Sequence, residues 1–410
     1  MSLAAPWPVA SAQRAITLAV AERANASLSV AAQGRFVAVS WLASSATAGT
    51  DAFVSVSHDG GATFGAPVRV NTTAGDAAGG GEMPPRVVLV PRAGADAPTL
   101  TVVWAAKREG GTRLLVAESS DGGRHFDASR VLPASVGAGN RGWHSVAVDA
   151  QQRVHVLWLD HRDVPPMHRH GAGAAPPAGP LPDPTARAAP SRLHFATLAD
   201  SQPTRVITGS VCYCCKTALV ASGTTLFAAW RHVFPGSQRD IALTVSRDGG
   251  RSFTAPRRVH ADGWQYDGCP DDGPTAALAR DGQLHVVWPS PKDGRSGSPM
   301  ALFHARTRDG RSFSARTPLP VEGVARHVTA VPSADGVLVV WDESTPSSRR
   351  VVLARSRAGL FGRTTFARTV LEGTEGGGYP GVAVTAEGAS VAWVAREEGR
   401  AVIKVLRVPP

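Results

Sequence analysis

The sequence predicts an all-β protein, a seven-bladed β-propeller of four-stranded antiparallel blades. Three observations predict it: a short Ser-x-Asp-x-Gly-x-x-Phe phrase recurs, seven apolar stretches end in tryptophan, and no segment has helical periodicity of useful length. A phrase that recurs along a chain of this length indicates an array of similar units. The composition, with 43% hydrophobic residues, 43 glycines and 31 prolines, fits many short strands joined by turns.

The recurring phrase predicts a tight hairpin turn. It occurs at residues 57–64, 119–126 and 246–253, with a shortened copy at 307–313. Its Asp and Ser side chains can hydrogen-bond the amides of the turn, its glycines permit positive φ, and its Phe can pack beneath. The phrase resembles the Asp box of the sialidase-like (BNR repeat) β-propeller family, and the resemblance covers nearly the whole chain. It implies the propeller fold, with these turns on the outside and away from the functional face.

The apolar stretches that end in tryptophan give the number of blades. Their mean spacing is about 59 residues, near the ~50 of the longer propeller repeats. Each follows a short strand and a turn, so one unit reads as strand, turn, Trp strand, loop, strand, Asp turn and strand. We expect the strand-end tryptophans to pack between blades. The stretches are 36–41, 100–104, 154–158, 226–230, 284–288, 337–341 and 389–393.

The two ends of the chain are expected to complete one blade together. The last unit, 381–408, supplies three strands, and the stretch 15–20 is an orphan strand ahead of the first blade. Pairing them closes the ring and removes the free edges that a partial blade exposes. A six-bladed sialidase-type ring is the alternative, and it would leave one Trp strand outside the ring.

We interpret residues 13–410 as one propeller domain, with a Pro/Gly-rich loop insertion at 161–191. Residues 1–12 are interpreted as the remnant of an export signal or a disordered start, because Ala10-Ser11-Ala12 has the small-x-small form of a cleavage site. By analogy with the fold family, we expect a periplasmic or secreted protein. No apolar run approaches the length of a membrane span.

The formal net charge of +10 comes mainly from arginine. The arginines are scattered over all blades and are not clustered with aromatic residues, which argues against nucleic-acid binding. An acidic glycan or another anionic surface is a fitting partner for such a chain.

The residues that open the inner strands are expected to converge at one mouth of the central channel. All four cysteines belong to this set, in two neighbouring blades. Thiolates favour Cu(I) or zinc, so we predict a metal site, with copper as the first choice and zinc as the second. The predicted ligands are Cys212, Cys214, Cys215 and Cys269, with His144, Met83 and, from the insertion, His168 and His170.

Two structural disulfides are an equally weighted alternative for these cysteines. One such arrangement pairs Cys212 with Cys215 and Cys214 with Cys269. A propeller of this size has a large core and hardly requires disulfides for stability. The Cys-x-Cys-Cys cluster also places more cysteines close together than cross-linking two strands requires. The sequence alone leaves both interpretations open.

Residues 212–217 and 268–270 resemble a cysteine-bearing subgroup of bacterial sialidase-like proteins, which are commonly labelled exo-sialidases. A retaining sialidase would need three arginines for the substrate carboxylate and a tyrosine nucleophile primed by a glutamate. The residues that could fill these roles are Tyr379, Glu375, Arg141, Arg231 and Arg326. The early Arg-Ile-Pro phrase of that family is missing. A glycan-active or glycan-binding propeller is therefore the second hypothesis, and a scaffold that binds a protein partner across its top face is the third.

Overall fold

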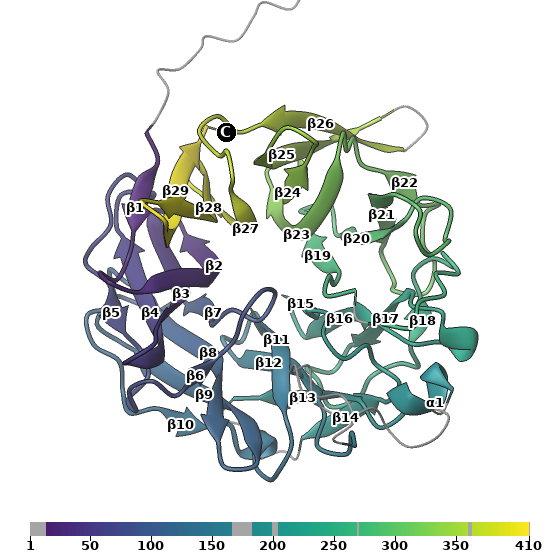
Figure 1. Cartoon of the computed structure of the whole chain (residues 1–410), viewed down its shortest axis with the longest axis horizontal. Coiled ribbons are helices and arrows are strands. Elements are labelled where there is room, and N and C mark those ends of the chain that lie inside the picture. Colours follow the sequence, from purple (N-terminus) through teal and green to yellow (C-terminus); the bar gives the residue numbers. More distant parts are fainter. Residues whose placement is uncertain (1–13, 166–182, 199–203, 269, 360–362, 410) are drawn as a thin grey trace, which may run out of the picture.

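The computed structural model describes residues 14–165, 183–198, 204–268, 270–359 and 363–409. These residues form seven antiparallel sheets arranged in a ring around a central channel, a seven-bladed β-propeller (Figure 1). The predicted fold is confirmed, and the six-bladed alternative is wrong because every Trp strand belongs to a blade of the ring. No helix in the described part of the chain is long and apolar enough to cross a membrane.

The first four blades follow one another along the chain. Blade one contains β2 (Ala24–Gln33), β3 (Phe36–Ser45), β4 (Gly49–Ser57) and β5 (Val68–Arg69). Blade two contains β6 (Ala77–Ala78), β7 (Arg86–Val90), β8 (Thr99–Arg108), β9 (Gly111–Ser119) and β10 (Arg130–Val131). Blade three contains β11 (Arg141–Val148), β12 (Val154–Asp160), β13 (Arg192–Thr197) and β14 (Arg205–Thr208). Blade four contains β15 (Ala218–Ser222), β16 (Thr225–Arg231), β17 (Ile241–Ser246) and β18 (Arg257–Arg258).

The last three blades repeat the pattern, and the N-terminal strand β1 completes the seventh. Blade five contains β19 (Thr275–Leu278), β20 (Leu284–Pro291), β21 (Met300–Thr307) and β22 (Thr317–Pro318). Blade six contains β23 (Val324–Ser333), β24 (Gly336–Ser344), β25 (Arg349–Ala358) and β26 (Thr364–Val370). Blade seven contains β27 (Gly378–Thr385), β28 (Gly388–Glu397), β29 (Arg400–Val408) and β1 (Ile16–Leu18). A short helix, α1 (Pro184–Ala188), lies in the predicted insertion, of which residues 166–182 are outside the described ranges.

Strand β1 closes the ring as predicted. It pairs antiparallel with β29, with Ile16 opposite Val405 and Leu18 opposite Ile403. The inner strands β2, β7, β11, β15, β19, β23 and β27 each pack beside the next, and the circle closes between β27 and β2. The ring therefore joins its two ends through a sheet that contains strands from both parts of the chain.

The core consists of apolar layers between neighbouring blades. Each strand-end tryptophan is almost fully buried and packs against the preceding blade, as Trp41 does against Ile403 and Val405 of blade seven. Trp288 does the same against blade four. These contacts confirm the predicted packing, although all seven strands continue past the tryptophan, as β3 does to Ser45.

The recurring turns have the hydrogen bonds that the phrase predicts. In blade four, the hydroxyl of Ser246 donates to Asp248 and accepts from the Gly250 amide at 2.8 Å. The Asp248 carboxylate accepts from the amide of Ser252 at 2.9 Å. Gly249 and Gly250 have φ of 73° and 89°, in the region that favours glycine. Each turn joins the third and fourth strands of its blade.

Candidate functional site

The inner strands of four blades carry the same irregularity where they begin at the channel mouth. Their pairing register shifts within a few residues of the strand start, as at Gly142/Ser145, Arg326/Thr329 and Gly378/Gly381. The first residue of each bulge has positive φ without being glycine: Ser27, Trp143, His327 and Tyr379. Bulges re-aim side chains, and strained backbone of this kind is concentrated at functional sites. The mouth is therefore the candidate site.

In blades six and seven, Asp342 organises the mouth. One carboxylate oxygen is 2.6 Å from Nδ1 of His327 and accepts from the Tyr379 amide at 3.0 Å. The other oxygen accepts hydrogen bonds from Nε and Nη2 of Arg349, at 2.9 and 2.7 Å. Burial alone would raise the pKa of Asp342, but His327 and Arg349 lower it below its usual range. Asp342 therefore holds a negative charge in a nearly inaccessible position.

Tyr379 and His327 present their rings together. The two rings stack with centroids 3.8 Å apart, and the Arg349 guanidinium lies 5.7 Å from the Tyr379 ring centroid. Gly378 lies beside them, and a Cβ there would be 2.4 Å from Nη2 of Arg349, so a side chain at this position would displace the guanidinium. Partial burial, with the nearby Asp271 carboxylate, raises the pKa of the Tyr379 phenol. At neutral pH this phenol is a proton donor rather than a phenolate.

A second polar group comes from blades two, four and five. The buried Glu82 carboxylate accepts from the Lys216 ammonium and, at 2.7 Å, from the Gly273 amide. Lys216 is also buried, so the two charges form an ion pair largely shielded from water. Glu82 and Lys216 are more than a hundred residues apart in sequence and meet only because the inner strands converge.

Two adjacent carboxyl groups lie beside this ion pair. Burial and repulsion from Glu82 raise the pKa of Asp272 well above its ordinary value, which favours its protonated form. Its Oδ1 is buried and has no hydrogen-bond partner among the described residues. Desolvation and Glu82 also raise the pKa of Asp271, which is more accessible and has φ of 48°.

The two polar groups meet at Gly81. A Cβ on Gly81 would be 3.7 Å from an Asp271 carboxylate oxygen and 3.7 Å from the Tyr379 hydroxyl. Asp271 and Tyr379 therefore flank one small space, which we call the mouth cluster. It comprises Glu82, Arg86, Lys216, Asp271, Asp272, Arg326, His327, Asp342, Arg349 and Tyr379.

The mouth cluster contains four basic side chains and four carboxyl groups. The basic side chains are Arg86, Lys216, Arg326 and Arg349, and the carboxyl groups are Glu82, Asp271, Asp272 and Asp342. Burial and repulsion from Glu82 raise the pKa values of Asp271 and Asp272, which favours their neutral forms. This shift biases the charge of the mouth towards positive, which favours an anionic ligand.

Three of the predicted cysteine ligands form a buried cluster behind this mouth. The sulfur atoms of Cys212, Cys214 and Cys215 all lie within 4.8 Å of one another. The Cys215 thiol donates to the Cys212 sulfur at 3.4 Å, and Arg239 Nη1 donates to the same sulfur at 3.3 Å. Trp143 packs against the cluster.

The three sulfurs are in different chemical states. Cys212 and Cys215 are free thiols, whereas Cys214 is disulfide-bonded. The hydrogen bond from Cys215 lowers the pKa of Cys212 to about 6, although burial opposes the shift, and Arg239 and Arg231 add to it. Burial raises the pKa of Cys215 well above its ordinary value. Cys269 lies outside the described residues, so its pairing with Cys214 stays a prediction.

The other predicted metal ligands do not join this cluster. His144 is buried and turns its Nε2 to the Val103 carbonyl of blade two at 2.8 Å. Burial lowers the pKa of His144 to about 3. Met83 packs in the apolar layer between blades two and three. His168 and His170 are outside the described residues. Copper or zinc binding therefore stays a prediction.

The structure brings only part of the predicted sialidase set to the mouth. Tyr379 and Arg326 are there, and Glu375 is exposed in the segment before β27. Arg141 is fully buried and donates to the carbonyls of residues 136–139. Arg231 is buried too, and donates to the carbonyls of Arg239, Asp272 and Pro289. Neither of these two guanidinium groups is free to bind a substrate carboxylate.

Sequence reasoning missed Asp342, Arg349, Lys216 and the Asp271–Asp272 pair. A usable signal existed for Asp342, because it directly follows a strand-end tryptophan and pairs with Arg326 at the start of the inner strand. Arg349 begins β25, the third strand of blade six, and no sequence pattern placed it at the mouth.

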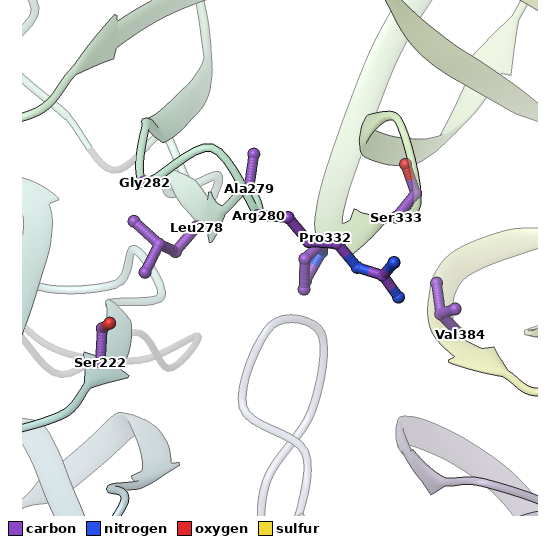
Figure 2. A pocket seen from close by; sticks show the side chains of 8 residues that line it. All are labelled: Ser222, Leu278, Ala279, Arg280, Gly282, Pro332, Ser333 and Val384. Atoms are coloured by element: carbon purple, nitrogen blue, oxygen red, sulfur yellow. The ribbon is translucent and has the colours of Figure 1, made fainter.

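A separate cavity of about 500 Å³ lies at the opposite end of the channel (Figure 2). It is lined by residues at or near the far ends of inner strands, including Ser222, Leu278, Ser333 and Val384. Among the described residues of its lining, Arg280 is the only charged one. Because it lacks paired titratable groups, the mouth cluster remains the better candidate for chemistry.

Several solved structures share this fold. An α-L-arabinanase of Penicillium chrysogenum, solved with arabinobiose, has a TM-score of 0.52 at 13% identity, covering 98% of this chain and 99% of its own. A PL25 ulvan lyase has a TM-score of 0.55 at 10% identity, covering 97% and 96%. A microbial sialidase, Hz136, has a TM-score of 0.47 at 15% identity, covering 88% and 73%. The likenesses to the arabinanase and the ulvan lyase show the propeller fold. No protein-family model matches the chain, and no curated protein sequence does.

Proposed function

We propose that the protein is a glycan-active propeller that binds an acidic glycan at the mouth cluster. The observation that supports this most is the convergence of Tyr379, its stacked His327 and the buried Asp272 carboxyl group with four basic side chains at one channel mouth. The fold is also one used by proteins named for glycans, the arabinanase and the ulvan lyase. The latter was also solved with a disaccharide that contains glucuronate.

The residues of the cluster suggest distinct roles. Arg326 is exposed and not tied to a carboxylate in an ion pair among the described residues, so it is the first candidate to contact a substrate carboxylate. The Tyr379 phenol can donate a proton to a leaving oxygen, because its raised pKa keeps it protonated. Asp342 holds His327 and Arg349 in place without needing to contact substrate. Asp271, across Gly81 from Tyr379, is the nearest candidate base.

Exo-sialidase activity is the narrower form of this proposal. It would need arginines other than Arg141 and Arg231 around the substrate carboxylate. It would also need a base for Tyr379 other than the exposed Glu375, and Asp271 is better placed. We therefore propose the broader class, acidic glycans that contain sialate or uronate.

The test is a screen of sialylated and uronate-containing glycans for binding and cleavage. Hydrolysis releases reducing ends alone, whereas β-elimination also gives an unsaturated uronate that absorbs ultraviolet light. Tyr379→Phe should lower turnover by about 100-fold or more, the usual size of a general-acid contribution. Tyr266→Phe is the matched control, because Tyr266 stacks on Trp264 outside the mouth cluster and should leave turnover unchanged. Equal activity of both variants, or no acidic ligand at all, would contradict the proposal.

Copper or zinc binding by the cysteines is a second proposal, supported by the three sulfurs within 4.8 Å. Its support is weaker, because Cys214 is oxidised and the Arg239 guanidinium occupies a coordination direction of Cys212. Elemental analysis of protein purified without chelators, before and after reduction, tests it. About one equivalent of metal that is lost in Cys212→Ser would support the site, and no metal in either state would exclude it.

A further inference from the structure

Cys212 and Cys215 have the spacing and contact of a dithiol pair. Two residues separate them, as in the Cys-x-x-Cys motif of thiol–disulfide exchange proteins. Their sulfurs are 3.4 Å apart, against about 2.05 Å in a disulfide bond. A small side-chain rotation would therefore bring them to bonding distance.

Hydrogen-bond donors converge on the sulfur atom of Cys212. Its sulfur accepts hydrogen bonds from the Arg239 guanidinium, the Cys215 thiol and the Cys214 amide. Arg231, almost fully buried near by, adds a second positive charge. An apolar packing role would need none of these donors.

A disulfide lies within reach of this pair. Cys214 is disulfide-bonded, and its sulfur is within 4.8 Å of both Cys212 and Cys215. We propose that Cys212 and Cys215 form a redox-active dithiol that exchanges with the Cys214 disulfide. This inference stands on the cysteine cluster alone and does not depend on the glycan proposal.

The exchange conserves electrons and needs no external oxidant. The Cys212 thiolate forms a bond to the Cys214 sulfur, the original S–S bond of Cys214 breaks, and the former partner leaves as a thiolate. That thiolate takes up the proton lost by Cys215. The Cys215 thiolate then attacks Cys212 and releases Cys214, which leaves a Cys212–Cys215 disulfide. One disulfide and two thiols are present before and after.

The pair also adjoins the mouth cluster through the backbone. Cys215 directly precedes Lys216, which holds Glu82, and the Cys215 sulfur accepts a hydrogen bond from the Asp272 amide. Bond formation at Cys215 would change this contact. A change in the redox state of the pair is therefore expected to alter the surroundings of Lys216 and Asp272.

The experiment is disulfide mapping of the full chain. Protein equilibrated in reduced and oxidised glutathione is quenched with acid, alkylated and digested, and its linked peptides are identified by mass spectrometry. Wild type should show two populations, one with Cys214 bridged and one with Cys212 linked to Cys215. In Cys215→Ser, the second step is blocked, so a Cys212–Cys214 bond should accumulate. Cys212→Ser is the matched control and should show neither product.

Either of two results would overturn the inference. The first is recovery of Cys212 as a fully alkylated thiol in wild type and in Cys215→Ser at every glutathione ratio. The second is the same distribution of disulfides in native and in urea-unfolded protein, which would mean that the folded environment contributes nothing. If a cysteine variant fails to fold, the mapping of wild type alone decides. Arg239→Gln keeps every cysteine but removes a hydrogen bond to the Cys212 sulfur, so it should slow the exchange.

Discussion

At the channel mouth, the Asp342 carboxylate holds two side chains and one backbone amide in place. Asp342 accepts from His327 and Arg349 of its own blade and from the Tyr379 amide of the next. It therefore joins blades six and seven at the point where both inner strands bulge. A single substitution at Asp342 affects the candidate site and an inter-blade contact together.

We predict that Asp342→Asn lowers the free energy of unfolding by about 1–3 kcal/mol, since it leaves charge-assisted hydrogen bonds unmade. The pKa of Asp342 is lower in the folded protein than its ordinary value of 3.8. Its contribution is therefore fully present above that ordinary value and is lost as the pH falls through the lowered folded value.

Urea unfolding of wild type and Asp342→Asn at neutral and acid pH measures this contribution. Asp335→Asn is the control, because Asp335 is an exposed carboxylate on the turn between β23 and β24. The stability gap between wild type and Asp342→Asn should narrow towards acid pH. A gap that widens on acidification, or that Asp335→Asn reproduces, would refute the role given to Asp342.

At the scale of the element, the Asp turns hold the third and fourth strands of a blade together. Burial opposes ionisation of Asp248, but hydrogen bonds from Ser252 and Ser246 lower its pKa to about 2. Asp248→Ala should lower the free energy of unfolding by about 1–2 kcal/mol, because several turn amides and hydroxyls lose their acceptor. Thermal and urea unfolding measure the loss. Asp96→Ala, at an exposed loop position, should be neutral.

The strands and turns could be predicted because each is encoded locally and repeated. The Trp strands, the Asp turns and the pairing of β1 with β29 all follow from short patterns in the sequence. Tyr379 could be placed at the mouth, and Cys212, Cys214 and Cys215 close to it, because they lie where inner strands begin. Asp342 carried a usable signal, its position directly after a strand-end tryptophan, but its contacts with His327 and Tyr379 did not, since they depend on bulges with positive φ at residues that are not glycine. No sequence pattern placed Arg349 at the mouth. Nor could the sequence distinguish the free thiols of Cys212 and Cys215 from disulfides.

At the scale of the whole molecule, stability depends on how the ring closes. Strand β1 is the outermost strand of blade seven, and every other strand of that blade comes from the C-terminal end of the chain. Without β1, the edge of β29 would expose unpaired backbone groups along Ile403–Val405, next to the apolar layer that contains Trp41. The ends of the chain are thus joined by noncovalent contacts alone in the described structure.

We predict that deletion of residues 1–20 lowers the melting temperature and promotes self-association, because the freed β29 edge can pair with another chain. Deletion of residues 1–13, which leaves β1 intact, is the matched control and should behave as wild type. Thermal unfolding together with size-exclusion chromatography measures both effects. A peptide that carries residues 14–20 should restore the melting temperature of the longer deletion, since it supplies the missing strand. If the longer deletion unfolds like wild type and stays monomeric, then β1 does not close the ring in solution, and the inter-blade core alone holds blade seven in place.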